Sequence, residues 1–259
     1  MTGTLLGIIF IFSGILCLAI RNKPKVGRYM IGFRVPYTFA SERAWKRAHE
    51  VVGVMFIAFG FMLIILAKIL PLSMLTVVML IELGAIISVG TLVAKREAEL
   101  ESFERLDENT EIKIIKPIDV KPWIAISVAM ILIYSAIVAY VYPLLPGKVA
   151  IHFDLSGKPD RFDDKIILFI IPIGFMLLMT LIMFFFREPT FKGSIIKPRD
   201  PQKLAKEILL LLVIVEFVIL LSFVNVIMFN LKGIFLGWLQ ILCLAFVLIQ
   251  IVRIILARF

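Results

Sequence analysis

Residues 72–94 have the sequence LSMLTVVMLIELGAIISVGTLVA, in which Glu82 is the single charged residue. A helix needs about 20 consecutive, predominantly apolar residues to cross the hydrocarbon core of a bilayer. Further runs of similar length and composition lie near residues 2–20, 51–70, 121–143, 166–186, 207–229 and 234–257. A transmembrane β-barrel would instead show alternating segments of about ten residues, and the sequence has none. It therefore predicts an all-α integral membrane protein with about seven transmembrane helices.

The overall composition supports the same class. Of the 259 residues, 61% are hydrophobic, whereas a soluble domain has about 45–50%. With seven spans, alternate loops lie on opposite sides of the membrane, and 22 of the 28 Lys and Arg residues fall on one side. The positive-inside rule then predicts a multi-pass protein of the cell membrane with its N-terminus outside and its C-terminus inside. This asymmetry explains the net charge of +9, so no nucleic-acid partner is expected.

A charged segment divides the chain. Residues 1–94 form a three-helix membrane region, 95–120 a charged cytoplasmic linker, and 121–259 a four-helix membrane region with an outer loop at 144–165. The two regions are expected to be separate domains.

The start of the linker is expected to be helical. Leu100, Phe103 and Leu106 recur every third residue, which indicates a helical extension of the third span. Residues 95–121 contain eight acidic and six basic side chains. Two interpretations remain open, namely contact with the basic segment 21–49 or a merely solvated linker.

The basic segment ends in a pattern typical of an amphipathic helix. Ser41 is a good helix N-cap, and one helical face after it carries Trp45, Ala48, His49 and Val52. The opposite face is charged and carries Glu42, Arg43, Lys46, Arg47 and Glu50. We expect this helix to run along the inner interface before it turns into the second span, with Trp45 as its lipid anchor. Its cations would meet anionic inner-leaflet lipids, each contact contributing about 1 kcal/mol.

The residues before this helix complete a family signature. Gly32 and Pro36 flank Arg34, which indicates a turn that holds one cation in a fixed direction. The spacing resembles the signature of the SdpI family of membrane proteins, which here comprises Gly32, Arg34, Thr38, Trp45 and His49, with Asn22 as a possible upstream match. In the best-known relatives, the immunity protein is proposed to sense a secreted toxin and to hold a transcriptional repressor at the membrane. The resemblance thus implies an extracellular peptide and a cytoplasmic regulator as partners. The alternative is that Arg34 and Trp45 only anchor the loop to lipid.

The outer loop carries a second resemblance. It is similar to a small membrane domain of unknown function that often accompanies the SdpI-type region, through Pro146, His152, Phe153, Gly157, Asp160 and Lys165. In the toxin-immunity relatives this domain precedes the SdpI-type region, whereas here it follows. Residues 149–154 alternate like a short strand, which would place His152 and Asp154 on one face. Residues 154–157 are typical of a turn.

Two interpretations of the polar side chains in this loop are open. A cation site would use ordinary metal-ligand atoms from His152, Asp154, Asp160 and Asp163. Their spacing matches neither an EF-hand loop nor a zinc signature. We therefore expect no metal, and instead a structured turn that caps the outer ends of spans four and five.

Glu82 and Glu216 are the two charged residues that lie deep within predicted spans, each about 15 Å from a helix end at 1.5 Å per residue. An ionised carboxylate at that depth costs on the order of 3 kcal/mol, so each is expected to face the helix bundle. Candidate hydrogen-bond partners are Asn225, Gln240, Tyr134 and Ser135. The acids form either a proton relay, cation relay or polar substrate site, or neutral groups that hydrogen-bond between helices.

No catalytic residue and no cofactor are expected. His49 begins a zincin-like pattern, but Gly53 stands where the second histidine is required. The sequence has no Gly-x-Ser-x-Gly elbow and no phosphate-binding glycine loop.

We favour a sensory or immunity membrane protein. Its outer loop would receive a peptide or small signal, and its cytoplasmic loop 21–50 would engage lipid or a cytoplasmic partner. The alternatives are a proton- or cation-coupled transporter that uses Glu82 and Glu216, and a structural membrane component.

Overall fold

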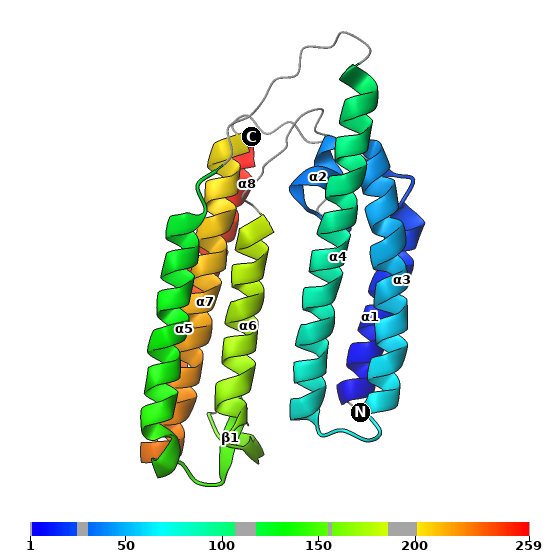
Figure 1. Ribbon diagram of the computed structural model, residues 1–259. Helices are drawn as coiled ribbons and strands as arrows, with labels where there is room; N and C mark the ends of the chain where they lie inside the picture. The colour runs from blue at the N-terminus through cyan, green and yellow to red at the C-terminus, as the bar shows by residue number, and fades with distance from the viewer. Residues whose placement is uncertain (1, 25–30, 107–117, 155–156, 186–200, 259) are drawn as a thin grey trace. The chain divides into compact units, whose positions relative to one another are not determined.

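The computed structural model describes residues 2–24, 31–106, 118–154, 157–185 and 201–258. Within these ranges the chain has seven helices that are long and apolar enough to cross a membrane (Figure 1). They are α1 (Thr2–Ile20), α3 (Glu42–Leu66), α4 (Leu72–Leu106), α5 (Lys121–Val141), α6 (Ile167–Phe185), α7 (Pro201–Lys232) and α8 (Gly237–Arg258). The predicted class, a helical membrane protein with seven spans, is confirmed. The orientation of the termini stays a prediction.

The second and third spans extend beyond the apolar runs. α3 already begins at Glu42, so the amphipathic segment is the first part of this span. The prediction of a separate interfacial helix that then turns is wrong. The Ser41 side chain caps one continuous helix by accepting the Ala44 N–H at 2.9 Å, and no proline interrupts it before Leu66. α4 continues to Leu106, which confirms the helical extension of the third span.

The chain divides into two compact units. Unit 1 comprises Met1–Asp119 with Phe185–Ala205, and unit 2 comprises Val120–Phe184 with Lys206–Phe259. Each unit is described separately below.

In unit 1, α1 and α3 approach so closely that their contact requires glycine. A Cβ added at Gly7 would lie 2.6 Å from the Gly60 carbonyl oxygen, and one at Gly14 would lie 2.5 Å from that of Gly53. Small residues at such positions let transmembrane helices pack backbone against backbone. α4 packs against α3 and completes an apolar core that contains Phe10, Cys17, Val52, Leu63, Leu75 and Ile86.

Unit 2 has an antiparallel hairpin between α5 and α6. The strands are β1 (Lys148–Phe153) and β2 (Pro159–Asp164), and a 3₁₀ turn, η2 (Tyr142–Leu144), precedes them. The strand predicted in this loop is therefore confirmed. The core joins the hairpin to the helices and contains Tyr134, Val138, Leu145, Val149, Leu168, Leu220, Val226 and Ile227.

Candidate functional site

The signature residues of unit 1 form buried polar contacts around His49. Its Nε2 accepts the Phe33 N–H at 3.0 Å, and its Nδ1 lies 2.7 Å from the Trp45 carbonyl oxygen. Because an amide N–H can only donate and a carbonyl can only accept, these partners assign the proton to Nδ1 and define a neutral imidazole. The ring is fully buried and stacks on the Trp45 indole with the centroids 4.0 Å apart.

Trp45 joins the start of α3 to the end of α1. Its indole is fully buried, and Nε1–H donates to the Ile20 carbonyl oxygen at 3.1 Å. Ile20 is the last residue of α1, and its carbonyl also accepts the Lys23 N–H at 2.8 Å, so the indole is its second donor. The prediction that Trp45 anchors the loop to lipid is wrong. The apolar face was predicted correctly, but it packs on protein.

Gly32 and Thr38 fix the segment that leads into α3. Gly32 has a φ of +98°, and a Cβ there would lie 2.4 Å from His49 Nε2, so only glycine fits. Thr38 holds the short helix α2 (Pro36–Ala40): its hydroxyl donates to the Val35 carbonyl at 2.8 Å and accepts the Val35 N–H at 3.2 Å. We call Gly32, Thr38, Trp45 and His49 the signature cluster.

Arg34 and Asn22 are less enclosed than most of the signature cluster. Arg34 is half-buried, with its Nε atom inside the protein. Asn22, just after α1, is exposed. A functional role for either side chain stays a prediction.

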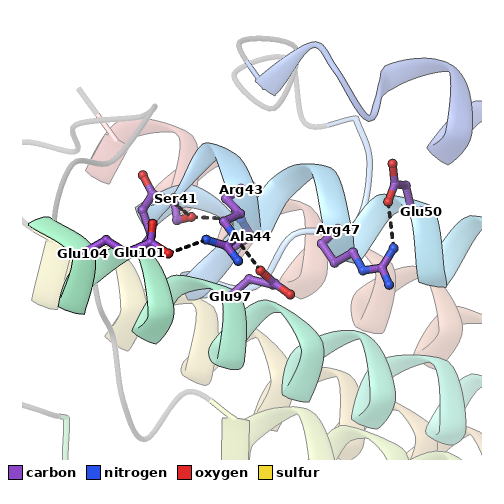
Figure 2. A network of polar contacts seen from close by, with 8 residues as sticks. All are labelled: Ser41, Arg43, Ala44, Arg47, Glu50, Glu97, Glu101 and Glu104. Carbon is purple, nitrogen blue, oxygen red and sulfur yellow. Dashed lines mark hydrogen bonds and ion pairs between the residues drawn. The ribbon is translucent and has the colours of Figure 1, made fainter.

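An acidic surface of α4 binds the start of α3 (Figure 2). The Arg43 guanidinium pairs with Glu97 at 2.7 Å and with Glu104 at 2.9 Å, and the Ser41 hydroxyl donates to Glu101. Of the two interpretations left open by the sequence, contact between the acidic extension of the third span and the basic segment is the one that these residues support. Multiple carboxylates around one guanidinium favour a specific alignment of the two helices.

The neighbouring surface of α3 presents cations. Lys46 and Arg47 are both exposed. Arg47 makes an ion pair with Glu50 at 3.2 Å, one turn along the helix. Exposed pairs of this kind contribute at most about 1 kcal/mol, so they constrain the side chains weakly. This surface of α3 is therefore exposed and cationic.

The β1–β2 hairpin of unit 2 is attached to the end of α7 and to the turn after it. The Asn230 amide accepts the Ala150 N–H at 2.8 Å and donates to the Ala150 carbonyl oxygen at 2.9 Å. Phe153 stacks on Phe235 with the centroids 4.2 Å apart and meets Phe229 edge-on at 4.8 Å. The predicted cap over spans four and five is therefore incomplete, because the hairpin also packs on α7 and the turn after it.

Other residues of the outer pattern shape the ends of the hairpin. Gly157 has a φ of +80° in the turn, where Asp154 Oδ1 accepts the Lys158 N–H at 2.9 Å. At the base of the hairpin, Lys165 Nζ donates to the Tyr142 carbonyl oxygen at 3.1 Å. These contacts make the hairpin a defined element with fixed ends.

His152 and Asp160 form an accessible pair on the hairpin. Nδ1 of His152 lies 2.5 Å from Oδ1 of Asp160, and the two side chains are 58% and 49% exposed. Within the described ranges, no three His, Cys, Asp or Glu side chains gather as a metal site would require. The candidate cation site is not assembled, because Asp154 caps the turn and Asp163 accepts the Asp164 N–H at 2.8 Å.

The two intramembrane acids lie in different units. Glu216 of α7 is fully buried, the Ser127 hydroxyl of α5 donates to its Oε1 at 2.7 Å, and the Thr180 hydroxyl of α6 lies 3.4 Å from the same oxygen. Glu82 of α4 is also buried and follows Leu75 by two helical turns, on the face that packs into the core of unit 1. Among the described residues, neither carboxyl oxygen of Glu82 has a hydrogen-bond partner.

Three of the four predicted partners of these acids make other hydrogen bonds. Asn225, Tyr134 and Gln240 bond to Leu236, Leu168 and Ser222, respectively. The fourth, Ser135, is not bonded to Glu82 or Glu216 in the described structure, and its role stays a prediction. Sequence reasoning missed Ser127 and Thr180, because an isolated hydroxyl in an apolar helix gives no periodic signal. The antiparallel order of α5, α6 and α7 is what brings the three side chains together.

These features define a multi-pass α-helical protein of the cell membrane. Residues 25–94 match the SdpI/YfhL protein family, and residues 129–184 match a domain of unknown function (DUF1648), so both resemblances are confirmed over these ranges. A search of curated proteins and a search of solved structures gave no match. The SdpI match indicates a membrane protein of the immunity type, and neither family is known for enzymes.

Proposed function

We propose that this protein is a sensory or immunity membrane protein that carries a signal from the outer hairpin to the cytoplasmic end of unit 1. The proposal adopts the orientation in which 22 of the 28 Lys and Arg residues lie inside. The hairpin then faces the outside, and residues 32–50 face the cytoplasm. The observation that carries the proposal is the exposed pair of His152 and Asp160 on a hairpin with fixed ends.

The hairpin has the properties of a receiving surface. An imidazole and a carboxylate side by side can bond the backbone or a charged terminus of a peptide. The exposed Phe162 ring on β2 adds apolar contact area. On the opposite side, the clamp between Asn230 and Ala150 connects the hairpin to the end of α7. A ligand that moves the hairpin would therefore act on α7 and α8.

The cytoplasmic end of unit 1 has the properties of a delivering surface. The signature cluster fixes the backbone, while Lys46 and Arg47 remain exposed. A fixed backbone that presents cations suits an acidic surface, which is either an anionic lipid headgroup or an acidic region of a cytoplasmic regulator. Because Trp45 and His49 are buried, their substitution would damage the fold and would not isolate the function.

Protection from secreted peptides tests the outer half of the proposal. Cells that express the chain are challenged with a panel of membrane-active antibacterial peptides and compared with cells that carry an empty vector. We expect protection against at least one peptide, and its loss in the double variant His152→Ala with Asp160→Ala at unchanged abundance in the membrane. The matched control is Lys158→Ala, an exposed residue of the same turn, which should keep protection. Equal survival with and without the chain across the panel would contradict the immunity role.

Crosslinking in cells tests the inner half. A photo-crosslinking amino acid at position 46 labels whatever lies against this surface. The same group at Phe61, an exposed residue nearer the C-terminal end of α3, reports ordinary lipid contact. We expect position 46 to capture a cytoplasmic protein or anionic lipid that position 61 does not, and Arg47→Glu to reduce that product. Identical products at both positions would contradict a delivering surface.

A further inference from the structure

Ser127, Thr180 and Glu216 converge from three helices of unit 2. The Ser127 hydroxyl oxygen lies 2.7 Å from Glu216 Oε1 and 2.5 Å from the Thr180 hydroxyl oxygen. The Thr180 hydroxyl oxygen also lies 2.9 Å from the Met176 carbonyl oxygen of its own helix, so its single hydrogen has more than one acceptor within reach. All of these contacts involve only one of the two carboxyl oxygens of Glu216. The cluster therefore holds the carboxyl group in one orientation through Oε1.

The second oxygen, Oε2, is buried and has no hydrogen-bond partner among the described residues. A buried carboxyl oxygen without a donor is unfavourable when the group is ionised. A proton on Oε2 removes the charge and leaves Oε1 as the carbonyl oxygen that accepts from Ser127. The geometry thus distinguishes the two oxygens chemically.

The oxygen spacing fits a hydrogen-bonded carboxyl group. Distances of 2.5 and 2.7 Å between oxygens lie in the range of O–H···O hydrogen bonds. A divalent cation would need several oxygens around it at about 2.0–2.6 Å, and the described residues contain no group of three His, Cys, Asp or Glu side chains that could hold one.

No nearby charge compensates an ionised Glu216 in the described structure. α6 carries no titratable residue. The titratable groups of α5, α7 and α8 other than Glu216 are Lys121, Tyr134 and Tyr140 on α5, Lys203, Lys206, Glu207 and Lys232 on α7, and Cys243, Arg253 and Arg258 on α8. On α7, the nearest of these to Glu216 toward the start of the helix is Glu207, which is paired with Arg253 at 2.9 Å. Among the described residues, the polar neighbours of the Glu216 carboxyl group are the two hydroxyls.

We propose that Glu216 is an intramembrane proton-binding site, in which Oε2 takes up and releases one proton while Ser127 and Thr180 hold Oε1. Uptake from hydronium leaves water and changes the charge of the site from −1 to 0, and release reverses both changes. Neither family match covers the whole site, since the second matched range ends at residue 184. The inference is independent of the sensory role of the hairpin.

Infrared spectroscopy of the full chain in lipid vesicles tests this site, with the proton as the probe. A protonated carboxyl group has a carbonyl stretch separate from that of a carboxylate. We expect a protonated carboxyl band that shifts when H₂O is replaced by D₂O and that is lost in Glu216→Gln. The matched control is Glu207→Gln, which removes an ion-paired carboxylate of the same helix and should leave the band unchanged. Glu82→Gln separates the contribution of the other buried acid.

Two results would overturn the proposal. One is a spectrum in which Glu216→Gln removes no protonated carboxyl band. The other is a band that is lost in Glu216→Gln but does not shift in D₂O, because such a carboxyl group does not exchange its proton and serves packing alone. If Glu216→Gln does not reach the membrane, Ser127→Ala is used to assign the carboxyl band to Glu216. Loss of the hydrogen bond to Oε1 should raise the carbonyl frequency, and an unchanged frequency would count against the site.

Discussion

His49 in unit 1 and His152 in unit 2 are the two histidines of the chain, and both lie within ranges that match a family model. Their surroundings are opposite. His49 is fully buried between a backbone donor and a backbone acceptor, whereas His152 is exposed beside Asp160. The first family pattern therefore includes residues that build the protein, and the second includes residues that a ligand can reach. A substitution at the first histidine tests folding, and one at the second tests function.

The largest expected loss of stability comes from substituting Trp45, on which the buried His49 ring stacks. Trp45→Ala should destabilise the protein by about 3–5 kcal/mol, because it removes a fully buried aromatic ring and leaves a cavity. Trp45→Phe keeps most of the ring and loses the bond to the Ile20 carbonyl, so it should cost about 1 kcal/mol. Thermal unfolding in detergent measures both. Equal effects of the two variants would show that the ring does not contribute through packing.

Gly32→Ala is expected to follow, with a loss of about 2–3 kcal/mol, since positive φ costs an L-residue about 1–2 kcal/mol and the Cβ must also displace His49. Gly233→Ala is a matched control, because that glycine has a φ of +70° and no neighbouring atom within 4 Å of an added Cβ. It isolates the conformational part of the cost. Unfolding at the same temperature in both variants would contradict the close approach of Gly32 to His49.

In unit 2, the hydrogen bonds between Asn230 and Ala150 can be removed without changing the pair of His152 and Asp160. Asn230→Ala should cost about 1–2 kcal/mol, because both backbone groups of Ala150 lose their partner and are only partly rehydrated. Protease cleavage within the hairpin should become faster. Asn22→Ala, an exposed residue of unit 1, should leave both stability and cleavage unchanged. Unchanged cleavage in Asn230→Ala would mean that the hairpin is held by its aromatic contacts alone.

The smallest expected effect concerns the polar surface in Figure 2. Arg43→Ala removes the ion pairs to Glu97 and Glu104, and exposed pairs contribute little because water and salt screen them. We expect a slight decrease in the melting temperature that disappears at high salt. A decrease that persists at high salt would mean that Arg43 acts through packing.

The helices were predictable because seven apolar runs of spanning length leave few alternatives. The same pattern could not say what an apolar helical face contacts. Trp45, Ala48, His49 and Val52 were correctly grouped, yet the partner was taken to be lipid and is α1 with the preceding loop. Hydrophobic spacing indicates that a helical face is shielded from water, and contact with either lipid or protein provides that shielding.

The partners of the buried acids were not predictable for a related reason. Ser127 and Thr180 meet Glu216 from two other helices. Which helices are neighbours depends on tertiary packing, which the hydrophobic pattern does not encode. For the same reason, nothing in the sequence indicated that Asn230 bonds to Ala150.

The paired glycines of α1 and α3 have a consequence for how unit 1 assembles. Gly7 meets Gly60 and Gly14 meets Gly53, so both helices repeat the contact after seven residues. A Cβ added at any of these four glycines would lie within 2.8 Å of an atom of the facing helix. The two pairs, seven residues apart, therefore fix the register of α1 against α3 at two levels.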